Sequence, residues 1–328
     1  MGSAIGLQVT DPVLDSELQS GLCAVEELMR ASVKSDYPFV TEAARHLVDA
    51  GGKRFRPLLV LLAAQFGEPA APGVVPAAVV VELTHLATLY HDDVMDEAAV
   101  RRGAQSANSR WTNAVAILTG DFLFARASDV LADLGPEAVR IQARTFDRLV
   151  HGQIRETVGP DPGVDPVEHH LRVISDKTGS LIATSCRFGA MLAGANEQTI
   201  EVLARYGERI GVAFQLSDDL IDLVGEVGVS GKTPGTDLRE GVLTLPVLLA
   251  LQGDERTRLR DLLDRDALDD DDLAEALRLL RVHPAMDEAR AILQRYADEA
   301  REALSPLPNI AAKAALSTLC DAVVARPA

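Results

Sequence analysis

The sequence predicts an all-α fold, a helical bundle in a single domain, on three observations. Hydrophobic residues make up 47% of the 328-residue chain and aromatic residues only 4%. The apolar residues are mostly Ala, Leu and Val, which suit closely packed helices better than sandwiches or barrels, and they recur at helical spacing. Strand patterns are scarce, since Val79–Val81 is short and lies within a helical pattern. Short linkers and a uniform composition favour one domain over residues 1–328.

Helix boundaries in the first half of the chain follow from its glycines and prolines. Gly51-Gly52 ends one helix, and Pro57 suits the first turn of the next, where no amide hydrogen bond is lost. Residues 68–76 hold three prolines and read as a loop. Residues 98–107 read as a loop or a frayed helix end. The helices expected here cover 15–32, 41–50, 53–66, 77–95, 111–134 and 137–158.

The second half continues in the same way. Residues 159–166 and 225–241 are rich in Gly and Pro and are expected to form loops. The helix over 167–192 is expected to bend near Lys177-Thr178-Gly179, because Gly and Thr are weak helix formers. The other helices expected here cover 197–224, 242–252, 270–281, 284–304 and 310–325.

Charge and cysteine content indicate which partners are disfavoured and in which cellular compartment the protein is expected. The formal charge of -17 opposes nucleic acid or an anionic membrane as the main partner. The three cysteines are scattered, without metal-ligand or disulfide spacing, as in a reducing cytosol. The first 18 residues lack a basic start, so no signal peptide is expected. The most apolar run, 76–90, is interrupted by Glu82 and His85. We therefore expect a soluble cytoplasmic protein with at most peripheral membrane contact.

Two acidic motifs stand out because each lies inside an apolar helical stretch. Residues 92–96 read Asp-Asp-Val-Met-Asp, and residues 218–222 read Asp-Asp-Leu-Ile-Asp. The first and last aspartates of each motif lie on one helix face and repel each other unless a cation holds them. Mg²⁺, which bridges carboxylates to substrate phosphates, fits best. The alternative is a solvated acidic face, which we assign to Asp269–Asp272, where no apolar stretch precedes the run.

Basic motifs accompany the acidic ones. Gly51-Gly52-Lys53-Arg54-Phe55-Arg56-Pro57 places three cations at a helix start, a position that suits an oxyanion, although a basic loop alone is usually just solvated. Arg101-Arg102-Gly103, Lys177-Thr178 and Lys232-Thr233 add further cations. In so acidic a chain, cations beside metal-binding carboxylates indicate a polyanionic ligand such as diphosphate.

These motifs, in this order, resemble the trans (E-type) polyprenyl diphosphate synthase family. The resemblance runs from about Gly51 to Leu249 and includes His85, Gly120-Asp121, Phe214-Gln215 and Gly235-Thr236-Asp237-Leu238. It implies an isoprenoid synthase fold around a central cavity. It also implies an enzyme that condenses isopentenyl diphosphate with geranyl, farnesyl or geranylgeranyl diphosphate, releasing diphosphate. A homodimer and a quinone side-chain product would match the family.

The resemblance also implies a role for each motif residue. Three Mg²⁺ ions are expected on the metal ligands Asp92, Asp96, Asp218 and Asp222. The catalytic residues are Asp92, Asp93, Asp96, Lys177, Thr178, Gln215, Asp218 and Asp219. The allylic diphosphate is held by Arg101, Lys177 and Lys232, and isopentenyl diphosphate by Lys53, Arg56, His85 and Arg102. Thr178 and Gln215 are expected beside the nascent cation, and Phe214 is a further substrate-binding residue. Without its neighbours, His85 would read as an ordinary core histidine.

One position departs from the family, and a few positions bear on product length. Many relatives have Lys where this chain has Val242, so one diphosphate contact is missing or supplied by Arg239. We expect Val242→Lys to change turnover little. Thr84, Ala87 and Thr88 are small, whereas an aromatic residue there would stop chain growth early. They predict a long all-trans product, unless they merely allow close helix packing.

Other enzyme classes fit the motifs less well. A class I terpene cyclase usually has an Asn/Ser/Glu-type second motif, and a squalene-type synthase lacks the Lys-Arg-x-Arg stretch. A non-catalytic partner subunit loses carboxylates, and none is lost here. A short-chain farnesyl or geranylgeranyl diphosphate synthase stays open as the alternative.

Overall fold

The computed structural model describes residues 9–224, 234–252, 257–263, 265 and 269–326. Within these ranges the prediction of an all-α fold is confirmed, because the regular elements are helices apart from one two-stranded hairpin. The chain divides into two compact units. The first comprises Met1–Asp147, Leu181–Gly207 and Ala303–Thr318, and the second Arg148–Ser180, Glu208–Glu302 and Leu319–Ala328. The single domain and its central cavity stay predictions.

The helices lie close to their predicted ranges because apolar periodicity and Pro or Gly at the ends defined them. In the first part of the chain the elements are α1 (Pro12–Ser32), α2 (Pro38–Asp49), α3 (Phe55–Ala64), α4 (Val74–Met95), β1 (Val100–Arg101), β2 (Ala104–Gln105), α5 (Ala107–Arg110) and α6 (Asn113–Ala132). They are followed by α7 (Pro136–Val158), α8 (Pro166–Ile174), the π-helical turn η2 (Ser175–Gly179), α9 (Ser180–Leu192) and α10 (Glu197–Val224). The last are α11 (Thr236–Arg239), α12 (Leu245–Ala250), α13 (Arg258–Leu263), α14 (Asp270–Arg281), α15 (Ala285–Ala303) and α16 (Ala311–Val324).

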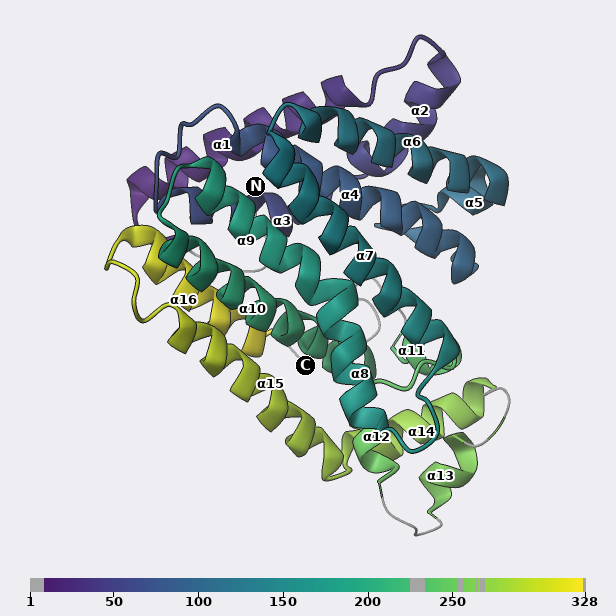
Figure 1. Cartoon of the computed structure of the whole chain (residues 1–328). Helices are drawn as coiled ribbons and strands as arrows, with labels where there is room; N and C mark the ends of the chain where they lie inside the picture. Colours follow the sequence, from purple (N-terminus) through teal and green to yellow (C-terminus); the bar gives the residue numbers. More distant parts are fainter. Residues whose placement is uncertain (1–8, 225–233, 253–256, 264, 266–268, 327–328) are drawn as a thin grey trace. The chain divides into compact units, whose positions relative to one another are not determined.

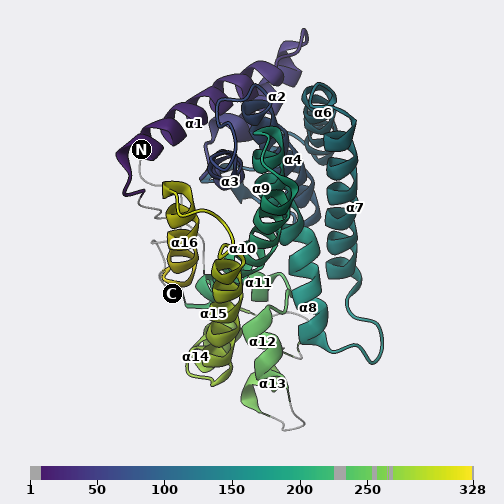
Figure 2. The same cartoon turned by 60° about the vertical axis from the view of Figure 1, so that its left-hand side comes forward.

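Helix α4 is the core helix of the first unit. It packs against α1, α3 and α6, and α6 runs alongside it in both views (Figures 1 and 2). Its run of Ala and Val from Ala77 to Val81 is fully buried. By length and composition alone α4 could cross a membrane, but 67% of its most apolar window is buried inside the protein. This degree of burial is typical of a core helix.

The second unit brings several short helices together. Helix α12 contacts α8 and α14, and α13 packs on α14 (Figure 2). In the acidic run at the start of α14, Asp269, Asp270 and Asp271 are exposed, as predicted, whereas Asp272 is largely buried and pairs with Arg265. Asp269 caps the helix by accepting from the Asp272 amide at 2.8 Å. Carboxylates at this end also complement the helix dipole.

The structure differs from the prediction in three loops. Residues 100–105 form a two-stranded antiparallel hairpin instead of a loop or a frayed helix end. Its turn residues Arg102 and Gly103 both have positive φ, 54° and 74°, as a two-residue type I′ hairpin turn requires. Short helices α11 and α13 were not predicted. The bend expected near residue 177 is the π-helical turn η2.

Candidate active site

The first acidic motif lies at the C-terminal end of α4, with its middle aspartate buried. Asp93 is fully buried, and Arg101 Nε donates to its Oδ1 at 2.5 Å. Arg101 Nη2 also lies 3.8 Å from Asp96 Oδ2. Asp92 is half-buried, and Asp96, which caps α4, is exposed. The outer carboxylates of the motif are thus accessible to a ligand, whereas the middle one fixes Arg101.

The hairpin after α4 joins two basic motifs that are distant in sequence. Arg101 turns toward Asp93, and Arg102 turns toward the glycine pair before α3, where it donates to Gly51 O. A Cβ added at Gly52 would lie 2.8 Å from Arg102 Nη1, and Gly52 has φ +147°. Glycine is therefore required at position 52 for two reasons: it tolerates the positive φ, and it leaves room for the Arg102 side chain.

A cluster of guanidinium groups surrounds one buried carboxylate on α4. Glu82 is 2% exposed, with Arg54 Nη1 at 2.9 Å and Arg102 Nη2 at 3.8 Å. Arg54 also donates to Glu26 and to Val48 O, so its role is structural. The charge of Glu82 acts on both Arg56 and Arg102, favouring their charged forms. Lys53 is exposed.

Burial in the cluster lowers the pKa of Arg56, Arg102 and His85. For Arg54 the effect of burial is outweighed by Glu82 and Glu26, so its pKa is raised. Burial and the neighbouring Arg102 lower the pKa of Arg56 to about 10, against the opposing pull of Glu82. Burial, with Arg56, Arg102, Arg101 and Arg54 adding to it, holds the pKa of His85 well below 6.5. His85 is therefore neutral at physiological pH while the arginines stay charged. Arg56 Nε is buried without a hydrogen bond to any residue in the described ranges. Such a donor calls for an anionic acceptor.

The second acidic motif, near the end of α10 in the second unit, repeats the pattern of the first. Asp219 is 3% exposed and is held by two side chains. Gln215 Nε2 donates to its Oδ1 at 3.1 Å, and His170 Nε2 lies 3.1 Å from its Oδ2. Gln215 in turn accepts from Thr178 Oγ1 at 3.2 Å. The structure thus brings together Thr178, Gln215 and Asp219, three residues that the sequence analysis grouped.

The outer aspartates of this motif also make contacts within the unit. The Asp222 carboxylate accepts from the amides of Thr236 and Asp237, each at 3.2 Å, and so caps α11. Asp218 Oδ1 lies 2.6 Å from Arg326 Nη2, and the Asp218 side chain is 40% exposed. The Asp218 side chain is thus partly exposed beside an arginine, whereas Asp222 has a capping role that was not predicted from the sequence.

The π-helical turn positions Lys177. Asp176 accepts from Arg148 Nε at 3.1 Å and from Arg155 Nη1 at 2.5 Å, which anchors the turn to α7. A Cβ added at Gly152 of α7 would lie 2.6 Å from the Lys177 backbone nitrogen, so only glycine lets the two segments approach this closely. Lys177 Nζ lies 2.5 Å from Glu156 Oε2.

Two other predicted diphosphate contacts have different outcomes. Lys232 lies outside the described residues. Arg239, which was considered as a substitute for a lysine at position 242, is half-exposed and pairs with Asp270 at 2.7 Å. The acceptor is the solvated acidic run of α14. The structure therefore gives Arg239 a surface ion pair instead of a ligand role.

The carboxylates fit a hard divalent cation that keeps much of its water. Across the described ranges, no three His, Cys, Asp or Glu side chains gather into a closed cage. Each motif instead offers carboxylates on partly exposed side chains beside an arginine, Arg101 at the first motif and Arg326 at the second. Mg²⁺ is typically held in this way, by one or two carboxylates together with substrate phosphates.

The three residues expected to control product length lie along α4. Thr84 is 1% exposed and accepts from Gln142 Nε2 at 2.9 Å, and Ala87 is fully buried. Thr88 is half-buried and donates to His85 O at 2.8 Å. A Cβ added at Gly120 of α6 would come within 3.1 Å of Ala87 O. Close packing of α6 on α4 is thus one function of the small residues here.

Several residues of the candidate site were missed from the sequence. Glu82 was noticed as an interruption of an apolar run, and a buried charge there should have indicated a partner. His91, next to Asp92, fills the space left by Gly120 and lies 3.5 Å from Asp121. No local pattern indicates His170 or Arg326, because their partners are far away in sequence.

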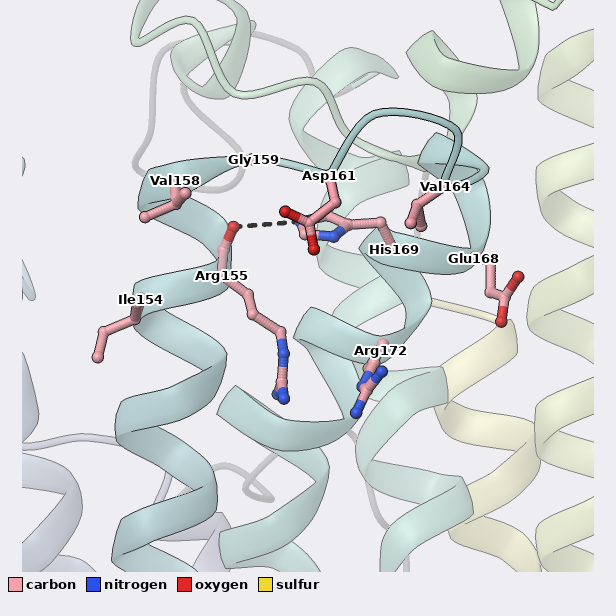
Figure 3. Close-up of a pocket in the computed structure, with 9 residues that line it drawn as sticks. All are labelled: Ile154, Arg155, Val158, Gly159, Asp161, Val164, Glu168, His169 and Arg172. Carbon is pink, nitrogen blue, oxygen red and sulfur yellow. Dashed lines mark hydrogen bonds between the residues drawn. The ribbon is translucent and has the colours of Figure 1, made fainter.

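A surface hollow of about 220 Å³ between α7 and α8 holds none of the predicted site residues (Figure 3). Arg155 and Arg172 point into it from the two helices, and His169 Nε2 lies 3.1 Å from Arg155 O. Its apolar wall, Ile154 and Val158, is 53% and 76% exposed. The residues that line this hollow include none from the two acidic motifs.

Comparison with known proteins identifies the family. The family model described as polyprenyl synthetase matches residues 37–280. The chain belongs to the polyprenyl synthetase family. A Mycobacterium tuberculosis protein named nonaprenyl diphosphate synthase is 49% identical over 98% of this chain and 97% of its own length. A second protein of that organism, named dimethylallyltranstransferase, is 44% identical over 95% of each chain.

A solved structure shares both fold and sequence with this polyprenyl synthetase. It is a geranylgeranyl pyrophosphate synthase from Corynebacterium glutamicum, complexed with calcium and isoprenyl diphosphate. It is 46% identical, with a TM-score of 0.86 over 97% of this chain and 98% of its own. The predicted family and fold are confirmed, and so is the prediction of an enzyme that transfers prenyl groups and elongates a prenyl chain. The individual site residues stay predictions.

Proposed function

We propose that the protein condenses isopentenyl diphosphate with an allylic diphosphate to give a long-chain, all-trans polyprenyl diphosphate and diphosphate. The observation that carries the proposal is the buried guanidinium cluster beside the first acidic motif. Arg56 Nε has no acceptor among the described residues, and Arg56 and Arg102 both interact with one carboxylate, Glu82. A diphosphate supplies what such a cluster lacks: dense negative charge and several acceptor oxygens.

The proposed allocation of substrates follows the two kinds of motif. Isopentenyl diphosphate binds Arg56, Arg102 and exposed Lys53, with neutral His85 as a hydrogen-bonding neighbour. The allylic diphosphate binds beside the outer aspartates, together with Arg101, Lys177 and Lys232. We propose three bound ions, Mg²⁺ in the cell, since calcium accompanies the isoprenyl diphosphate in the relative from Corynebacterium glutamicum.

The protein's contribution to the reaction is preorganised charge and exclusion of water. The C–O bond of the allylic diphosphate breaks, leaving a carbocation that the alkene of isopentenyl diphosphate attacks. Bound divalent ions supply positive charge for the leaving diphosphate. Arg101 and Lys177, already oriented by Asp93 and Glu156, stabilise that charge without reorganisation. The hydroxyl of Thr178 and the amide of Gln215 offer oxygen atoms to the nascent cation. The departing diphosphate takes the proton.

The long product is supported by the absence of bulk at Thr84, Ala87 and Thr88 and by the likeness to a nonaprenyl diphosphate synthase. The alternative is a geranylgeranyl-length product, which the 46% identity to a geranylgeranyl pyrophosphate synthase favours.

We further propose a cytoplasmic homodimer. The support is an exposed apolar stripe on α7, formed by Val150, Ile154 and Val158 at helical spacing, and a second on α6, formed by Ile117 and Leu118. Large apolar side chains in such a row mark an interaction surface.

One assay tests the catalytic proposal. Purified protein is incubated with Mg²⁺, farnesyl diphosphate and labelled isopentenyl diphosphate, and the product is dephosphorylated and sized by chromatography. We expect Mg²⁺-dependent incorporation of label into a product longer than twenty carbons. Label confined to a twenty-carbon product would support the short-chain alternative, and no incorporation would reject the function.

A further inference from the structure

The last residue that the structure describes, Arg326, lies against the second acidic motif. It follows α16 by two residues. Its Nη2 lies 2.6 Å from Asp218 Oδ1, and its guanidinium carbon lies 4.6 Å from the centroid of the Phe214 ring. Both partners belong to α10, and both are among the residues implied to bind metal or substrate.

Arg326 is buried and only partly hydrogen-bonded. Its side chain is 13% exposed, and its Nη1 is buried without a hydrogen bond to any residue in the described part of the chain. Removing a charged donor from water without an acceptor is costly, whereas stacking on an aromatic ring fixes the plane of the guanidinium. The side chain is thus held in one orientation, with a donor to spare, beside a carboxylate.

The position of Arg326 also bears on the missing lysine at position 242, where this chain has Val242. The family resemblance expects a lysine there for a diphosphate, and Arg239 is engaged with Asp270 on the surface. Val242 is half-buried and carries no charge. Arg326 supplies the same kind of charge from the other end of the chain, next to the acidic motif itself.

We propose that Arg326 is a ligand of the allylic diphosphate: Nη1 donates to a diphosphate oxygen while Nη2 keeps its ion pair with Asp218. A planar guanidinium can serve both acceptors at once, which a point charge cannot do as well. It also separates two anionic groups that would otherwise repel each other. This inference rests on the proposed function and adds a substrate-binding residue to it.

Binding of inorganic diphosphate in the presence of Mg²⁺, measured by calorimetry, tests the inference without turnover. Arg326→Ala is expected to weaken binding by about 10-fold or more, the usual effect of losing a hydrogen bond to a charged group. Arg326→Lys recovers only part of the loss, because it lacks the planar fork. Arg290→Ala, which removes an exposed arginine of α15 paired only with Asp287 among the described residues, is the matched control and binds as the wild type.

Steady-state kinetics distinguish a ligand from a counter-ion. In Arg326→Ala the KM for the allylic diphosphate rises by a similar factor, and the KM for isopentenyl diphosphate is unchanged. Unaltered diphosphate affinity in Arg326→Ala overturns the inference, and so does a change confined to the Mg²⁺ concentration for half-saturation. If the wild-type protein neither binds diphosphate nor makes a prenyl product, the proposed function itself is rejected. The two kinds of failure are therefore distinguishable.

Discussion

At the scale of single residues, His85 shows how the arginine cluster sets protonation. Burial is the largest cause of its lowered pKa, and Arg56 and Arg102 add to it. A neutral imidazole among guanidinium groups can accept or donate one hydrogen bond without adding charge. It therefore suits the rim of an anion site better than a second lysine would, since a further cation would raise the cost of burial.

We predict that His85 titrates well below pH 6.5, the ordinary pKa of an imidazole. Because its pKa in the folded protein lies below the unfolded value near 6.5, the unfolded state binds the proton first as the pH falls. As the pH falls below 6.5, the free energy of unfolding should therefore decrease, and this group contributes up to about 1.4 kcal/mol per pH unit. His85→Gln should lack that component in urea melts. A ring proton signal of His85 that titrates near pH 6.5 would contradict this account.

Ala87 gives a second prediction, about product length. Ala87→Phe places an aromatic ring where we expect the growing chain to pass, so the product should be shorter. Ala87→Ser, which changes the volume little, should keep the wild-type product. Chromatography of the dephosphorylated products checks both. Unchanged chain length in a folded Ala87→Phe protein would mean that Ala87 serves only the close approach of α6, as the Gly120 contact also allows.

At the scale of elements, each acidic motif combines a helix end with a buried anchor. The middle aspartates, Asp93 and Asp219, are both buried and bound to other side chains, and each motif retains at least one outer aspartate that is partly exposed. The likeness of the two acidic motifs in sequence thus extends to their local structure. A fixed middle carboxylate orients its partners, while the outer side chains of Asp92, Asp96 and Asp218 are partly exposed, where a ligand can reach them.

The π-helical turn yields a prediction because it depends on one glycine. In Gly152→Ala the added methyl would meet the Lys177 backbone nitrogen at 2.6 Å, so the turn carrying Lys177 and Thr178 must shift. We expect a loss of about 1–3 kcal/mol in unfolding free energy from overpacking and a clear fall in kcat. Gly179→Ala is the matched control, since its Cβ meets nothing closer than 3.4 Å. Equal activity in the two variants would show that Gly152 is not required.

The sequence predicted the elements that have strong periodicity and missed those fixed by contact. Long helices such as α4 and α10 were placed within a few residues, because apolar spacing and Gly or Pro at their ends define them. The hairpin at residues 100–105 was missed, since strands of two residues have no readable alternation. The two positive-φ residues that make its turn include an arginine, which turn statistics do not favour.

The residues of the candidate site also fall into two groups, those that the sequence predicted and those that it missed. Motif residues were found because several chemical groups recur at fixed spacing. Glu82, His170 and Arg326 were not, because each acts through a side chain that only tertiary folding brings near. Arg326 pairs with a residue more than one hundred positions earlier. Local patterns carry no information on such pairs.

At the scale of the whole molecule, the exposed apolar stripe on α7 supports the proposed dimer. Val150, Ile154 and Val158 recur every four residues and so lie on one face of the helix. In a monomer this row would be a solubility liability. The net charge of -17 opposes random association, so that a specific apolar contact would have to bring two copies together.

We predict that Ile154→Glu converts the protein from dimer to monomer, because a carboxylate buried at the centre of an apolar contact would have no partner. Sedimentation equilibrium across micromolar concentrations measures the change. Val282→Glu, at an 80% exposed position at the C-terminal end of α14, is the matched control and should leave the assembly intact. If Ile154→Glu sediments as the wild type does, the stripe on α7 is not the contact. If the wild type is itself monomeric, the homodimer is rejected, and the stripe must be covered by another molecule.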